Sequence, residues 1–97
     1  MKMVMLVIDE ARKEELEVVL EGAGVAGYTE LSRAAGRGTT GPKLGSRAFP
    51  RTSAVVFTVL SAEALAGLRT TLGSFCADCG ERLKMFAWDA ESIELAP

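Results

Sequence analysis

Glycines and basic side chains are concentrated in one stretch of the chain, from position 36 to position 52. Glycine stands at positions 36, 38, 41 and 45, and five of the eleven basic residues lie in or just before this stretch: Arg33, Arg37, Lys43, Arg47 and Arg51. Glycine lets a backbone approach an anion closely with its N–H groups exposed. Arginine and lysine neutralise the charge of such a ligand, and arginine adds a two-pronged donor. The composition favours an anion-binding loop, with a flexible solvated connection as the alternative.

The charge distribution sets this stretch apart from the rest of the molecule. No Asp or Glu occurs between Glu30 and Glu63, although the net charge of the whole chain is −2. Without the five cations, the remainder holds thirteen acidic and six basic residues, a net charge of −7. A basic segment on an acidic body indicates an anionic ligand or an acidic partner surface. The acidic body argues against nucleic acid as a partner.

The glycine-rich stretch matches neither of the common phosphate-binding signatures. It contains no GK[ST] sequence, and no helix is expected directly after it, so it is not a Walker loop. Its glycines follow the second strand of a predicted hairpin, which is not the position of the dinucleotide-binding turn. An anion site here would depend on the local backbone and on Arg37 and Lys43, which could neutralise the charge of the ligand.

Two cysteines, Cys76 and Cys79, form a CxxC pair. Such a pair supplies two thiolates, and a structural zinc site needs further ligands, which Asp78 or another copy of the chain would have to provide. The chain has no histidine, and a CxxC that follows a helix is not placed like a thioredoxin motif. A site for an unidentified metal or a redox sensor is one interpretation, and two small residues in a loop is the other.

The remaining polar residues contain no catalytic constellation, so we do not expect an enzyme. Histidine is absent, and no pair of buried acids is evident. The aromatic side chains are expected in the core or between subunits, not as platforms for RNA bases: Phe57, Phe75, Phe86 and Trp88. No apolar run reaches eighteen residues, and the start of the chain does not resemble a signal peptide. We therefore expect a cytoplasmic protein without membrane insertion.

Hydrophobic periodicity predicts four strands and two helices. The strands are expected at 1–8, 28–34, 53–60 and 83–88, and the helices at 10–23 and 62–75. Asp9 and Ser61 are suitable N-caps for the two helices. The order β-α-β-β-α-β is that of the ferredoxin-like α+β fold, a four-stranded antiparallel sheet with two helices on one face. The stretch 36–52 then lies at the tip of the hairpin between the second and third strands.

The length of 97 residues indicates one domain, covering 1–97. A chain of this size buries a modest core, and many such domains gain stability by self-association. A homo-oligomer is therefore expected.

The segment Gly27-Tyr28-Thr29 and the turn Gly36-Arg37-Gly38 resemble the PII signal-transduction proteins. Members of that family have a similar strand start and glycine turn, followed by a long mobile T-loop, and the order of elements matches over about residues 1 to 88. The resemblance implies a homotrimer with adenine nucleotides, ATP, ADP or AMP, in clefts between subunits. It also implies that Thr29 contacts the base and that the 36–38 turn contacts the phosphates.

Two more sets of residues follow from the resemblance. Lys84 corresponds to the lysine of a second glycine-rich loop in the family, although the Thr-Gly and Asp-Gly of that loop are missing here. The stretch 36–52 corresponds to the T-loop, so Lys43, Arg47 and Phe49 are expected to dock on a partner such as a transporter, an enzyme or a regulator. Three hypotheses remain open: a nucleotide sensor, an interaction module that has lost nucleotide binding, and a trimer that responds to metal or redox state through Cys76 and Cys79.

Overall fold

The computed structural model describes residues 1–38, 41–77 and 83–96. Two helices, one short 3-10 helix and six strands follow one another in the order β1 (Lys2–Asp9), η1 (Glu10–Arg12), α1 (Lys13–Gly22), β2 (Thr29–Ala34), β3 (Gly36–Gly38), β4 (Gly41–Lys43), β5 (Ser53–Leu60), α2 (Ala62–Phe75) and β6 (Leu83–Asp89). Four of the strands form an antiparallel sheet in the order β2-β5-β1-β6, and β3 and β4 form a separate hairpin.

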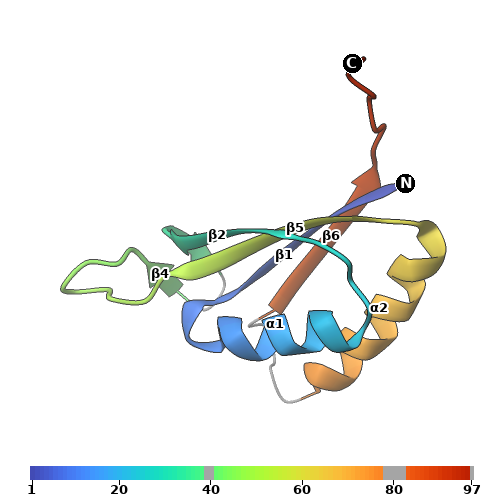
Figure 1. Cartoon of the computed structure of the whole chain (residues 1–97). Helices are drawn as coiled ribbons and strands as arrows, with labels where there is room; N and C mark the ends of the chain where they lie inside the picture. Colours follow the sequence, from blue (N-terminus) through green and yellow to red (C-terminus); the bar gives the residue numbers. More distant parts are fainter. Residues whose placement is uncertain (39–40, 78–82, 97) are drawn as a thin grey trace.

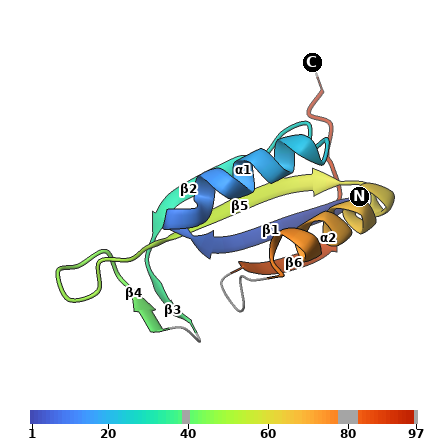
Figure 2. The same cartoon turned by 90° about the horizontal axis from the view of Figure 1, so that it is seen from below.

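Both helices lie on the same face of the sheet (Figures 1 and 2). The other face, which we call the open face, is covered by no element of the described chain. This architecture confirms the predicted ferredoxin-like fold. Neither helix in the described ranges is long and apolar enough to cross a membrane.

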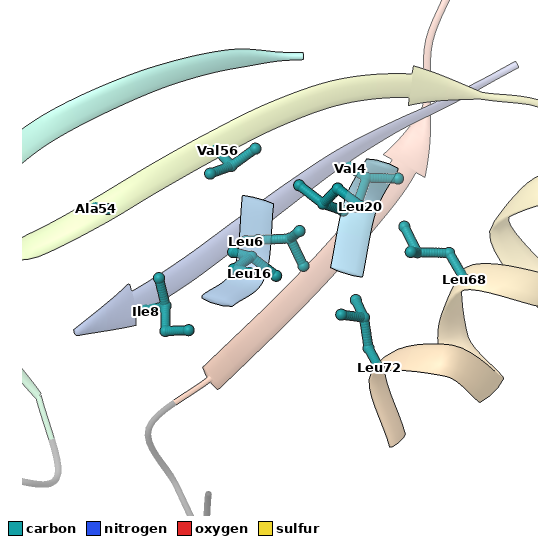
Figure 3. Close-up of a cluster of buried hydrophobic side chains, with 9 residues drawn as sticks. All are labelled: Val4, Leu6, Ile8, Leu16, Leu20, Ala54, Val56, Leu68 and Leu72. Carbon is teal, nitrogen blue, oxygen red and sulfur yellow. The ribbon is translucent and has the colours of Figure 1, made fainter. Parts of the chain in front are cut away.

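The core lies between the helices and the two central strands, β1 and β5. Apolar residues alternate along β1, and Val4, Leu6 and Ile8 point to the helices and are at most 1% exposed. Leucines of both helices and small residues of β5 complete the cluster in Figure 3: Leu16, Leu20, Leu68, Leu72, Ala54 and Val56. Since a strand turns successive side chains to opposite faces, the same alternation places Met3, Met5 and Val7 on the open face.

Both predicted cap residues accept a backbone N–H: Ser61 caps α2, whereas Asp9 caps the 3-10 turn η1 that precedes α1. The Asp9 carboxylate accepts the N–H of Ala11 at 3.0 Å, and the Ser61 hydroxyl accepts the N–H of Ala64 at 3.0 Å. The first turn after Asp9 is a 3-10 turn, so α1 begins at Lys13 and not at residue 10 as predicted. The Glu10 N–H donates to the Thr52 carbonyl at 3.0 Å, which ties this turn to the chain entering β5.

The stretch 36–52 has more regular structure than the predicted loop. Gly36 pairs with Lys43 and Arg37 with Pro42 in the β3–β4 hairpin. Residues 44–50, which we call the basic loop, fold back on themselves because Leu44 and Ser46 both donate to the Phe49 carbonyl. Strands of three residues carry no detectable hydrophobic period, which is why the sequence did not reveal this hairpin.

Gly45 holds a position in the basic loop that other residues would not easily take. Its φ is +66°, and a Cβ there would lie 3.0 Å from a methyl group of Thr52. Both the left-handed backbone and the close approach require glycine.

Candidate functional site

The β3–β4 hairpin leaves the end of the sheet where β1 ends, and it is open to ligands. Gly36, Arg37 and Gly38 are all exposed. A Cβ built on either glycine would meet nothing within 4 Å, so a ligand has access to this backbone. The Arg37 side chain has no hydrogen-bond or ion-pair partner among the described residues. The hairpin can therefore present backbone N–H groups and one guanidinium to an anion.

Lys43, the residue opposite Gly36, is held by the body of the protein. Its ammonium lies 3.2 Å from Asp9 Oδ2, and the two side chains are only 15% and 10% exposed. Arg51 Nη1 lies 3.9 Å from the same carboxylate oxygen, with its side chain largely in solvent. The sequence predicted Lys43 as part of a partner-docking loop, and the structure places it beneath that loop.

The charges around Asp9 keep its carboxyl group ionised. Burial by itself raises the pKa of Asp9, but the hydrogen bond from the Ala11 N–H and the Lys43 ammonium, with a smaller contribution from Arg51, outweigh this effect. The pKa of Asp9 therefore lies below its ordinary value of 3.8. The sequence predicted Asp9 as a helix cap only, and no local pattern signals its contact with residues 34 and 42 positions away.

Arg47 and Phe49, the other two residues predicted to dock on a partner, lie on the outer turn of the basic loop. Arg47 is exposed, and Phe49 and Leu44 are 44% and 48% exposed. The Phe49 N–H donates to the Ser46 hydroxyl at 3.1 Å, which closes this turn. The loop thus offers a small surface of one cation and two apolar side chains.

A cleft of about 660 Å³ lies at the base of the basic loop, and the sequence did not predict it. Residues from η1, α1, β2 and the loop line it: Glu10, Lys13, Ser32, Arg33, Gly45, Pro50 and Thr52. Strand β2 bulges between Leu31 and Ala34, and Arg33 takes a left-handed φ of 57° there while its N–H donates to Glu10 Oε1 at 2.6 Å. Left-handed backbone at a residue other than glycine is strained and is enriched at functional sites.

The two cations of this cleft differ in their neighbours. Lys13 lies 3.3 Å from Glu30 and 3.5 Å from Glu10, and the hydrogen bond with Glu30 is the main cause that raises the pKa of Lys13. Arg33 has no carboxylate partner for its side chain in the part of the chain that the structure describes. An anion entering the cleft would therefore meet Arg33 as the available charge.

Thr29 and Lys84 lie far apart within one chain. Thr29 begins β2, and Lys84 lies on β6, the opposite edge of the sheet. Both face the open side, but with strands about 4.8 Å apart, three strand spacings separate them by roughly 14 Å or more. One subunit cannot bring these two predicted nucleotide contacts together.

The open face is markedly apolar. Cross-strand rows run over it, such as Phe57–Met5–Phe86 and Val59–Met3–Trp88. Several of its large side chains are between 43% and 54% exposed: Leu31, Val59, Phe86 and Trp88. Exposed apolar surface of this kind is typical of interaction sites.

The predicted cysteine pair is only partly described. Cys76 caps the C-terminus of α2 and is half-buried, and Cys79 lies outside the described residues. Within residues 1–38, 41–77 and 83–96, no three His, Cys, Asp or Glu side chains are grouped as metal ligands would be.

No protein-family model matches the chain, and no curated protein matches it in sequence. Solved structures match it closely in fold. One of them is CPII, a nitrogen regulatory PII-like protein from Thiomonas intermedia K12, which was solved with ADP, AMP and bicarbonate bound. Its sequence is 21% identical to this chain. The two structures superpose with a TM-score of 0.73, and the match covers 90% of this chain and 82% of the CPII chain. This chain has the PII-like fold.

Two further CPII structures agree with this assignment. The complex with ADP and bicarbonate is 22% identical, with a TM-score of 0.74 over 90% of this chain and 82% of that chain. The apo form is 18% identical, with a TM-score of 0.69 over 90% and 85%. The resemblance to PII-like proteins that the sequence suggested is confirmed at the level of the fold.

Proposed function

We propose that this protein is a PII-like regulator and not an enzyme. It binds an adenine nucleotide in clefts between the subunits of a homotrimer and reports the bound state to a partner protein through the basic loop. The observation that carries the proposal is the shared fold, because structures with this fold were solved with ADP and AMP bound. The 36–52 stretch acts as the T-loop of this chain.

The residues of the hairpin suit the phosphates of such a ligand. The 36–38 backbone is exposed and unobstructed, and Arg37 supplies a guanidinium that can bind two phosphate oxygens at once. Thr29 would contact the base. When bound, the nucleotide supplies a negatively charged group that this basic region recognises.

Separation of the predicted contacts within one chain supports a site between subunits. Thr29 and Lys84 lie on opposite edge strands, β2 and β6. In a closed ring in which the β2 edge of one chain meets the β6 edge of the next, Lys84 of one subunit would reach a ligand that Thr29 of its neighbour contacts.

The open face supports self-association. At about 25 cal/mol per Å², covering its aromatic and aliphatic side chains would stabilise an assembly by several kcal/mol. A second and third copy of this chain supply matching apolar surface, and the helices already cover the other side. Three copies are the number implied by the PII-like fold.

Isothermal titration calorimetry with ADP, AMP, ATP and bicarbonate, on protein whose mass has been determined by light scattering, tests this function. We expect three times the chain mass of 10.3 kDa and saturable binding of at least one adenine nucleotide. Arg37→Ala should weaken that binding about tenfold or more, since a charge-assisted phosphate contact contributes about 1.5–3 kcal/mol. Arg69→Ala, which removes the same charge from α2, serves as the control and should bind like the wild type.

Two results would separate the alternatives. A trimer that binds none of the four ligands would exclude the sensor and favour an interaction module with the same fold. A monomer would contradict the assembly and, with it, the cleft between subunits.

A further inference from the structure

We propose that Asp9 and Lys43 form an ionic lock that holds the basic loop closed, and that an anion bound at the 36–38 turn releases it by competing for Lys43. The competition with a ligand rests on the proposed function. The lock itself does not, because its contacts lie within one chain.

Both ends of the basic loop meet at one carboxylate. Lys43 directly precedes residues 44–50 and Arg51 directly follows them, and each places its charged group near Asp9 Oδ2, at 3.2 and 3.9 Å. Asp9 itself is fixed by the end of β1 and by its hydrogen bond to the Ala11 N–H. The loop is therefore closed on the rigid core through a side chain that also caps the first turn before α1.

Lys43 is placed to serve two partners. Its backbone pairs with Gly36 across the β3–β4 hairpin, and Arg37 pairs with Pro42 next to it. The cation that Asp9 holds is thus the cross-strand neighbour of the glycine turn that would receive an anion. If the Lys43 ammonium turns toward a ligand phosphate, it leaves Asp9.

Because the Asp9–Lys43 pair is largely buried, Lys43 should leave Asp9 only when a ligand is bound. Removing one member of a largely buried ion pair leaves the other charge without compensation, which is strongly unfavourable. Without an anion, Lys43 therefore stays with Asp9 and the loop stays closed. An anion at the hairpin gives Lys43 a replacement partner, so ligand binding and loop release become coupled equilibria.

Hydrogen exchange on the ligand-free protein tests the lock with Asp9→Asn. Asparagine still offers an oxygen to the Ala11 N–H, so the cap is kept while the charge is lost. We expect the loop amides of Leu44, Gly45 and Ser46 to exchange at least about tenfold faster, and the core amides of β1 and β5 to be unchanged. Unchanged exchange at the loop amides would overturn the lock.

Asp89→Asn is the matched control. It breaks the Lys2–Asp89 pair, which is shorter at 2.7 Å but has the Asp89 side chain 86% exposed. Because exposed pairs contribute little, exchange in the basic loop should stay at the wild-type rate. Accelerated loop exchange in this control would show that Asp9→Asn acts through general destabilisation, and would overturn the lock.

Lys43→Met breaks the lock from the other side and keeps much of the side-chain volume. It should open the loop to about the same degree as Asp9→Asn, and the double variant should open it no further. Fully additive effects of the two changes would contradict a direct pair. This cycle also tests the lock if Asp9→Asn folds poorly.

ADP is the probe for the coupling. Asp9→Asn should bind ADP at least about fivefold more tightly than the wild type, because the ligand no longer competes with Asp9 for Lys43. Equal or weaker binding would overturn the competition. If the wild type binds no ADP, the proposed function fails, whereas the exchange experiment still decides whether the lock exists.

Discussion

The two faces of the sheet are made by the same strands but have opposite relations to solvent. On the covered face, Val4, Leu6 and Ile8 are at most 1% exposed beneath the helices. On the open face, Phe86 and Trp88 are 52% and 46% exposed, and no described element lies over them. Figure 2 views the sheet from the covered side, with both helices in front of it.

Because the two faces differ in burial, one should govern folding and the other the association of subunits. The covered face is completed within one chain, so its packing should decide whether the chain folds. The open face also carries large apolar side chains but is covered by nothing in the described chain, so its packing should decide whether subunits associate. Changes to the two faces should therefore affect different measurements.

The largest effect is expected from a charge on the open face, in Phe86→Glu. An unpaired carboxylate in an apolar interface costs several kcal/mol per subunit, so the proposed assembly should dissociate to monomers. Light scattering measures the mass, and circular dichroism checks that the secondary structure remains.

Val18→Glu is the control for this prediction. Val18 is 68% exposed on α1, on the side of the helix opposite the buried Leu16 and Leu20, so its substitution should leave the mass unchanged. An unchanged mass for Phe86→Glu would show that the open face is not the subunit interface.

A smaller effect is expected on the covered face from Leu6→Ala. Leu6 is fully buried between the helices and the sheet (Figure 3), and leucine-to-alanine changes in such positions lower the free energy of unfolding by about 2–5 kcal/mol. Urea denaturation at one fixed protein concentration measures this loss. Val18→Ala on the exposed side of α1 should change stability by no more than about 0.5 kcal/mol, and a similar loss in both variants would contradict the assignment of the core.

The covered face includes one group of charged side chains, Lys13, Glu17 and Glu30, between α1 and β2. Glu30 lies on the covered side of β2 and pairs with Lys13, but its Oε2 is buried without a hydrogen-bond partner among the described atoms. Glu17 of α1 lies beside it. The hydrogen bond that a protonated Glu17 would donate to Glu30, followed by burial and repulsion between the two carboxylates, raises the pKa of Glu17 above its ordinary value of 4.5.

The smallest effect is expected in this group of charged side chains, from Glu17→Gln. A carboxyl group with a raised pKa in the folded state binds its proton more tightly when folded, so its contribution to stability falls as pH rises from about 4.5 through the folded-state pKa. The variant should therefore be more stable than the wild type at pH 7 and should lose this part of the pH dependence. Thermal unfolding between pH 4 and pH 8 measures both, with Glu63→Gln on α2 as the control; equal pH profiles for Glu17→Gln and the wild type would exclude the shift.

Much of the fold could be predicted because its signals are local. The alternation in 1–8 and 53–60, the caps at Asp9 and Ser61, and the order of elements all lie in short windows of sequence. The hairpin within 36–52 escaped prediction because three-residue strands gain their order from cross-strand pairing. The start of α1 moved to Lys13 because the preceding turn is bonded to Thr52, a contact across 42 positions.

The candidate site, too, could be predicted from the sequence only in part. Composition alone located the basic, glycine-rich stretch and distinguished it from the acidic body, because charge and glycine content are properties of a segment. The sequence could not show that Lys43 lies under the loop against Asp9, that Arg33 and Glu10 meet at a cleft, or that Thr29 and Lys84 lie on opposite edges of the sheet. Those relations depend on strand order and register, which bring distant residues together or hold them apart and which only the tertiary structure decides.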